Sequence, residues 1–178
     1  MLNKILSYGV IAGLMAGVPL SVLTVSMAGK PPLTHGMAIG YLTMLIALTA
    51  VFAGVKRYRD QDLGGVIAFW PAFGMGLGIS VIAGLFYVAA WEASVAITHM
   101  DFASDYAKFV IEDRKAHDMS GEALAKFSAE MEQFKVQYAD PLFRLPMVFA
   151  EIFPVGVLVS LVSAALLRNR RFLAVRRA

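Results

Sequence analysis

Four long stretches of apolar residues constrain this chain more than any other feature of its sequence. A helix needs about 20 residues, at about 1.5 Å each, to cross about 30 Å of hydrocarbon, and each stretch is about that long. Strands of a membrane barrel would alternate polar and apolar residues, whereas these stretches are apolar on every side. They predict four transmembrane helices, at Ile5 to Met27, Met37 to Val55, Ala72 to Ile97 and Leu142 to Leu167.

The composition supports a membrane protein, with 58% hydrophobic and 16% charged residues. The chain has no cysteine, which excludes disulfides, thiolate metal sites, a cysteine nucleophile and a lipoprotein anchor. The first apolar stretch is longer than the core of a secretory signal, which is about 7 to 15 residues, so we expect it to be retained as a helix. The expected fold class is all-α: a polytopic membrane protein built as a four-helix bundle.

One long polar segment, residues 100–140, separates the third and fourth stretches. It carries five basic and nine acidic residues. Two amphipathic helical patterns lie within it, the first at Phe102, Tyr106 and Phe109, the second at Leu124, Phe127, Met131, Phe134 and Tyr138. Asp118 to Gly121 predicts the turn between them, and Asp140-Pro141 the end of the second helix.

We therefore expect a helical hairpin outside the membrane. Its helices would pair with each other and rest on the outer ends of the bundle. The alternatives are a docking surface for a protein partner at residues 101–140, or a hairpin that lies flat in the headgroups.

Lysine and arginine near the span ends predict sidedness. With four spans both termini share a side, and basic residues are concentrated after the second span and in the tail. We expect both termini in the cytoplasm, the hairpin in the periplasm, and a multi-pass protein of a bacterial inner membrane. The basic residues considered for contacts with anionic lipid, with no nucleic-acid partner expected, are Lys56, Arg57, Arg59, Arg168, Arg170 and Arg171.

The expected organisation has four parts. Residues 1–99 form transmembrane helices one to three, and residues 100–140 form the extracytoplasmic hairpin. Residues 141–168 form transmembrane helix four, and residues 169–178 form a basic cytoplasmic tail.

Small residues spaced four apart mark the expected contacts between the spans. Lipid tails are as apolar as leucine, so helices in a bilayer associate through close backbone approach and polar pairs. These contacts can form within one chain or across a homo-oligomer, and we favour contacts within one chain. The expected packing residues are Gly9, Gly13, Gly17, Gly36, Gly40, Gly74 and Gly78. The fourth span repeats the pattern at Gly156, Ser160 and Ala164.

Two carboxylates, Glu92 and Glu151, lie inside the apolar stretches, where an acid costs at least about 2.5 kcal/mol. Both belong to the outer leaflet. Seven residues make about two helical turns, so His99 shares a face with Glu92 and Arg144 with Glu151. Arg144 can neutralise one of the two acids. The residues expected within reach of this zone are Tyr41, Tyr87 and His35.

This group is the candidate ligand or proton site, and it has a structural alternative: a polar cluster that only fixes helix packing. The sequence contains no Gly-x-Ser-x-Gly, no His-Glu-x-x-His and no phosphate-binding glycine loop. We therefore expect no enzyme activity, no cofactor and no metal. The expected function is structural or partner-binding, and the alternative is a small proton-coupled transporter that acts as an oligomer.

A familiar pattern runs from Gly54 to Ile67, which reads Gly-Val-Lys-Arg-Tyr-Arg-Asp-Gln-Asp-Leu-Gly-Gly-Val-Ile. It continues at Phe69, Phe73, Tyr87, Trp91-Glu92, Phe134, Pro141-Leu142-Phe143 and Phe153-Pro154-Val155-Gly156. With these residues the chain resembles the bacterial membrane family catalogued as domain of unknown function 4199. The resemblance implies a bacterial four-span protein and no established activity.

Overall fold

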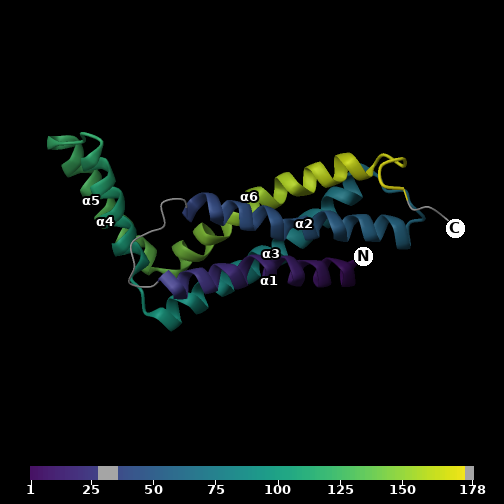
Figure 1. Ribbon diagram of the computed structural model, residues 1–178, viewed down its shortest axis with the longest axis horizontal. Coiled ribbons are helices and arrows are strands. Elements are labelled where there is room, and N and C mark those ends of the chain that lie inside the picture. Colours follow the sequence, from purple (N-terminus) through teal and green to yellow (C-terminus); the bar gives the residue numbers. More distant parts are fainter. Residues whose placement is uncertain (28–35, 175–178) are drawn as a thin grey trace.

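The computed structural model describes residues 1–27 and 36–174, and this part of the chain contains six α-helices and no strand (Figure 1). In chain order they are α1 (Leu2–Met27), α2 (Gly36–Asp62), α3 (Phe69–Thr98), α4 (Phe102–Ala116), α5 (Gly121–Ala139) and α6 (Pro141–Leu167). The all-helical fold class is confirmed.

Four helices, α1, α2, α3 and α6, are long and apolar enough to cross a membrane, as expected of a multi-pass membrane protein. The second is longer than its apolar stretch. It continues through Lys56, Arg57 and Arg59 to Asp62, beyond the predicted end at Val55. Polar pairs one turn apart favour this extension, since Lys56 Nζ bonds Asp60 at 2.6 Å and Arg57 Nε bonds Gln61 at 3.0 Å.

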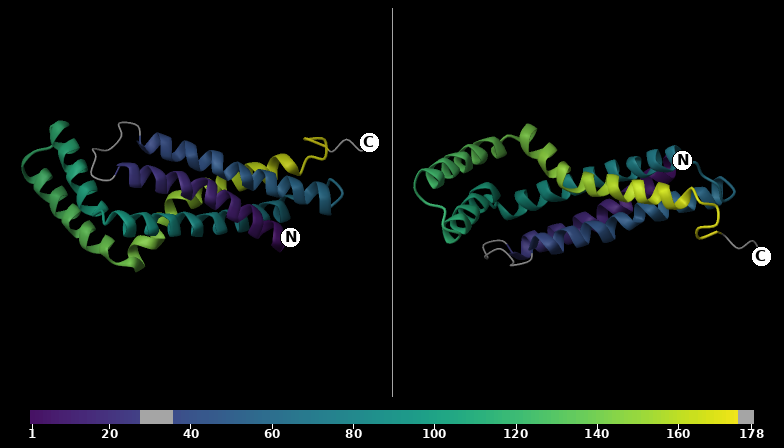
Figure 2. Two further views of the ribbon diagram at one scale, coloured as in Figure 1. Left: turned by 60° about the horizontal axis from the view of Figure 1, so that its bottom comes forward. Right: turned by 90° about the horizontal axis from the view of Figure 1, so that it is seen from above.

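The third helix lies at the centre of the four long helices. It packs against α1, α2 and α6, and α2 also contacts α1 and α6. Figure 2 shows the four helices side by side, with the start of α1 and the end of α6 at the same end. Both ends of the described chain therefore lie away from α4 and α5.

A row of three glycines brings α1 close to α3. A Cβ atom added at these glycines would lie 2.5 Å from Ile82 Cβ, 2.4 Å from Phe86 Cβ and 2.8 Å from Ala90 Cβ, for Gly9, Gly13 and Gly17 respectively. Carbon atoms in contact are about 3.5 to 4.0 Å apart, so a larger residue would push the helices apart. The row thus packs within the chain.

The contact between α3 and α6 is built from two glycine–serine pairs. An added Cβ would lie 2.8 Å from Ser160 Cβ at Gly76 and 2.7 Å from Ser80 Cβ at Gly156. The hydroxyls of Ser80 and Ser160 are 3.3 Å apart, and each donates to the carbonyl of the glycine four residues before it. Both serines are buried, so their polar groups are satisfied inside the apolar helices.

The other expected packing glycines differ among themselves. Gly78 approaches Ile5, with 3.1 Å from an added Cβ to Ile5 Cγ2, and Gly36 is the first residue of α2. The expectation of close packing within one chain is wrong for Gly40 and Gly74, because no described residue lies within 4 Å of a Cβ added at either position. A spacing of four residues defines a face of a helix but not the neighbour that this face meets.

The predicted hairpin is present as α4 and α5, which pack against each other. The Asp101 side chain accepts from the Ser104 backbone N–H at 3.1 Å and caps α4. The α5 stripe is half-buried or buried as expected. On α4 the buried residues are Ala103 and Ala107, and Phe109 is 48% exposed, so the expected seam position of Phe109 is wrong.

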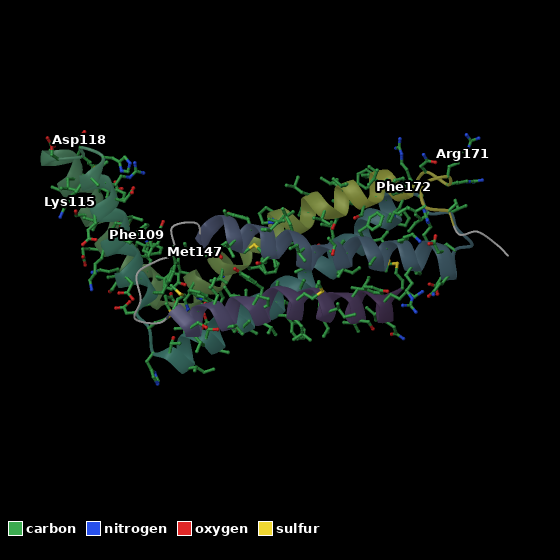
Figure 3. All side chains as sticks on the ribbon, viewed as in Figure 1. Phe109, Lys115, Asp118, Met147, Arg171 and Phe172 are labelled. Carbon is green, nitrogen blue, oxygen red and sulfur yellow. The ribbon has the colours of Figure 1, made fainter. Side chains whose placement is uncertain are left out.

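The hairpin does not lie across the ends of the long helices. Where the structure describes the chain, its contacts run to α6 and, through Trp91, to α3 rather than across α1 and α2. Figures 1 and 2 show α4 and α5 projecting beyond the long helices. In Figure 3 Asp118 marks its tip, far from Arg171 at the opposite end of the molecule. The expected cap is therefore an arm, and we call α4 and α5 the arm.

Candidate functional site

A charged pair joins α3 to α6 at the foot of the arm. Arg144 donates from Nε to Glu92 Oε1 at 2.7 Å and from Nη2 to Glu92 Oε2 at 2.6 Å. The side chains are only 17% and 30% exposed, for Arg144 and Glu92 respectively. A guanidinium that meets both oxygens of a carboxylate fixes orientation as well as distance. Of the two acids expected near Arg144, Glu92 is the one that it neutralises.

The same arginine reaches the last turn of α5. Its Nη1 donates to the Tyr138 backbone carbonyl at 3.3 Å, and its guanidinium carbon lies 5.8 Å from the centre of the Tyr138 ring. The Tyr138 hydroxyl accepts from Trp91 Nε1 at 2.9 Å. Tyr138 is thus held by α3 and α6 together, and it fixes the arm to both.

Aromatic rings extend this attachment into the arm. Trp91 meets Phe102 edge to face, with ring centroids 4.9 Å apart, and Phe102 lies 5.4 Å from Tyr138. The series continues from Phe102 to Tyr106 at 5.8 Å and from Tyr138 to Phe134 at 5.4 Å. Aromatic pairs of this kind contribute about 0.5 to 1.5 kcal/mol each beyond the area they bury.

Two ionisable groups of the arm have shifted pKa values. Burial, with a smaller effect of the carboxylates of Glu151 and Glu92, raises the pKa of Tyr138 to about 12. The hydrogen bonds from Ser104 lower the pKa of Asp101. At neutral pH both shifts favour the forms present in the folded arm. These are the neutral phenol of Tyr138 and the ionised carboxylate of Asp101 that caps α4.

The second intramembrane acid, Glu151, has a different environment. It lies on an exposed position of α6, and its one hydrogen bond with the described residues comes from the Tyr87 hydroxyl at 3.4 Å. Tyr87 is only 5% exposed, whereas Tyr41 of α2 is 49% exposed. Among the described residues, the candidate group therefore divides into an acid paired with arginine at the arm and an acid that no described cation contacts.

Of the two histidines expected in this group, the structure describes only His99, and His99 does not join it. His99 ends α3 in a left-handed conformation (φ 50°), is exposed, and makes no hydrogen bond or ion pair with the residues that the structure describes. His35 lies outside the described residues. Within the described ranges, no set of three or more histidine or acidic residues is arranged to hold a metal ion.

Arg59 was expected to contact anionic lipid, and its position in the structure contradicts this expectation. Its side chain is fully buried and donates to three backbone carbonyls at and beyond the end of α6, at 3.4, 2.9 and 3.0 Å for Leu167, Phe172 and Leu173. The free carbonyls at a helix end attract a cation, which explains this position. Arg59 is thus unavailable to headgroups, whereas Arg57, Arg168, Arg170 and Arg171 are exposed and Lys56 is half-buried.

Sequence reasoning missed Trp91, Tyr138 and Arg59 as members of polar networks. In the sequence, Trp91 contributed only to the family resemblance, Tyr138 was only a residue of the second amphipathic pattern, and Arg59 was a candidate for contact with anionic lipid. The only signal for the first two was their place at the junction of span and hairpin, since a tryptophan and a tyrosine there both need a partner for a polar atom.

Comparison with known proteins gives one match. The family model described as "Protein of unknown function (DUF4199)" matches residues 7–169, which is more than half of the chain. No curated protein and no solved structure matches the chain.

Proposed function

The chain belongs to the family described as "Protein of unknown function (DUF4199)", and from this premise we propose that it is a non-enzymatic inner-membrane protein that presents the arm to a protein partner. The family supplies no activity, so the proposal depends on the structure. The observation that carries it is a firmly attached arm that leaves its own outer surface uncovered.

The attachment of the arm uses more interactions than a simple loop requires. A bidentate ion pair, a tryptophan–tyrosine hydrogen bond and an aromatic series converge on Tyr138. A connection that only links two spans would be satisfied by a short turn, whereas this one orders two helices at a definite angle to the membrane helices. A rigid mount of this kind reduces the entropic cost of binding a partner.

The free surface of the arm suits a protein partner. All nine acidic residues between residues 100 and 140 are exposed. On α4 the exposed residues Asp105, Phe109 and Glu112 follow one another at i, i+4 and i+7, so an aromatic ring lies between two carboxylates on one face. A partner with basic residues around an apolar pocket would complement this face.

The distribution of charge supports the membrane sidedness that we propose. Exposed arginines cluster at the end of the molecule that holds the start of α1 and the end of α6, and the acidic arm is at the other end. Positive charge beside the spans is retained in the cytoplasm. We place both termini there and the arm in the periplasm.

Sidedness can be tested directly, because the chain has no cysteine. Single variants Asp118→Cys at the tip of the arm and Arg171→Cys at the opposite end are treated with a membrane-impermeant maleimide on spheroplasts. We expect labelling of the first before lysis and of the second only after lysis. The reverse order would reject the proposed orientation.

Docking is tested by photo-crosslinking in cells. A benzophenone amino acid at position 109 should give a discrete protein adduct, and Asp105→Asn with Glu112→Gln should remove it. The control position is Leu142, 83% exposed at the start of α6, which should give lipid adducts only. Lipid adducts at position 109 would mean that the arm lies in the headgroups, and no adduct along the arm would reject docking.

A second candidate, proton-linked transport by an oligomer, is favoured by the lack of a cation beside Glu151 within the described residues. Carboxylates inside a bilayer commonly belong to proton pathways. Glu151→Gln should abolish proton-linked flux in liposomes while leaving the protein folded. Flux equal to that of empty liposomes for the unaltered protein would reject this candidate.

A further inference from the structure

Glu151 is an exposed acid in a part of α6 that hydrocarbon would surround. It follows Pro141 by ten residues, which is about 15 Å along the helix. An acid at such depth costs at least about 2.5 kcal/mol when it has no partner, and its single bond here is the 3.4 Å contact with the Tyr87 hydroxyl. The position therefore calls for a further group beside the carboxylate.

One phenol lies beside this carboxylate, that of Tyr87 from α3, whose hydroxyl is 3.4 Å from Glu151 Oε2. Tyr87 is buried, whereas Tyr41 on α2 is 49% exposed. A charge in apolar surroundings is stabilised only when it is paired, so this carboxylate favours a cationic ligand that supplies the countercharge.

An apolar groove lies between α2 and α6, the helices that carry Tyr41 and Glu151. Its volume is about 450 Å³, and it is lined by Leu45, Ile46, Thr49, Phe52, Leu158, Val159, Val162 and Ser163. Glu151, Leu158 and Val162 are spaced i, i+7 and i+11, which places them on one face of α6. Tyr41, Leu45 and Phe52 are spaced i, i+4 and i+11 on α2. The polar group and the apolar groove thus lie along one seam.

The outer halves of the long helices, as far as the structure describes them, offer no free lysine or arginine, either in this chain or in a second copy. Their one such residue is Arg144, which is bonded to Glu92 at both carboxylate oxygens. A metal ion is also a poor fit, because a single carboxylate with one phenol offers too few strong ligands.

We propose that Glu151, Tyr87 and the groove between α2 and α6 bind an organic cation that carries an apolar body, taken from the membrane. The positive group lies at the carboxylate and the apolar body fills the groove. The inference goes beyond docking by the arm and does not require transport, since it concerns binding alone.

The test uses the full chain in lipid nanodiscs and two ions of the same shape and opposite charge, tetraphenylphosphonium and tetraphenylborate. We expect saturable binding of the cation only. Glu151→Gln should weaken it at least about tenfold, Glu151→Asp should retain part of it, and Thr49→Trp, which fills the groove, should weaken it too. The control is Glu132→Gln, which removes an exposed carboxylate of the arm and should leave binding unchanged.

A second measurement avoids variants altogether. Dicyclohexylcarbodiimide modifies carboxyl groups inside membranes, so mass spectrometry can follow its addition to Glu151 in the unaltered protein. The phosphonium ion should slow this addition at least several-fold and the borate should not. Equal binding by the Glu151→Gln variant, equal binding of both ions, or an unchanged rate of modification would each overturn the proposal.

Discussion

Replacing Gly76 with alanine tests whether the glycine–serine contact holds α3 against α6. The added Cβ would lie 2.8 Å from both Cβ and Oγ of Ser160, and 3.2 Å from its Cα. To restore a contact of about 3.5 Å, the helices must separate locally by about 0.7 Å. Overpacking of this kind costs about 1 to 3 kcal/mol.

The matched control lies two residues earlier on the same helix. Alanine is the better helix former by about 1 kcal/mol, and this gain is common to both substitutions. At Gly74 no atom lies within 4 Å of the new Cβ, so Gly74→Ala should keep or raise stability. The difference between the two variants, about 1 to 3 kcal/mol, therefore measures the steric cost alone.

The assay is unfolding in mixed micelles with increasing dodecyl sulfate, followed by circular dichroism and tryptophan fluorescence. We expect Gly76→Ala to unfold at the lower detergent fraction and Gly74→Ala to match or exceed the unaltered protein. Equal stability of the two variants would refute the argument, because it would mean that α3 and α6 do not meet at Gly76.

Three further predictions concern the polar networks. Glu92→Gln and Arg144→Met should each lower the free energy of unfolding by about 1 to 3 kcal/mol, since each leaves one partly buried charge unpaired, and the double variant should lose less than the sum in the same assay. The pKa of Tyr138 rises from 10 to about 12 on folding, so its contribution is intact below pH 10 and is lost as pH rises toward 12. Circular dichroism against pH should show this step, and Tyr138→Phe should lack it. Arg59→Met should speed tryptic cleavage of the segment after α6 several-fold in inverted vesicles, whereas Arg57→Met should not.

The helices were predictable because hydrocarbon leaves a chain few choices. An apolar stretch of about 20 residues must satisfy its own backbone, and an amphipathic stripe must find a partner. The end of α2 was not predictable from hydropathy, since its last turns depend on polar pairs such as Lys56 with Asp60. Helix length beyond the membrane is decided by side-chain bonds that an apolar count ignores.

The sequence predicted the length of each span better than the rotation of the span about its own axis. Three glycines, Gly74, Gly76 and Gly78, alternate in α3, and the spacing of four selected the first and the last. The structure turns Gly76 toward α6, Gly78 toward Ile5 and Gly74 away from any neighbour. A sequence states which residues share a face, but the neighbour of that face depends on how all four long helices pack.

For the candidate site, the sequence predicted the depth of the two acids in the membrane but not which of them pairs with Arg144. Two acids at similar depth are candidates for Arg144, and the sequence left both pairings open, although spacing along α6 places Arg144 on the face of Glu151. The structure pairs Arg144 with Glu92, and in this position the guanidinium also bonds the Tyr138 carbonyl. The acid that Arg144 neutralises is thus the one at the attachment of the arm to α3 and α6.

This choice has a consequence for function. A guanidinium that bonds both oxygens of Glu92 cannot make the same bidentate pair with a second carboxylate. The positive charge of Arg144 is therefore used at the foot of the arm and does not neutralise Glu151. If Arg144 were free to serve both acids, the arm would lose its mount whenever Glu151 took the charge. Because the two acids are separated in this way, docking by the arm and binding of a cation in the groove depend on different residues, and variants at Phe109 and at Glu151 should impair one without the other.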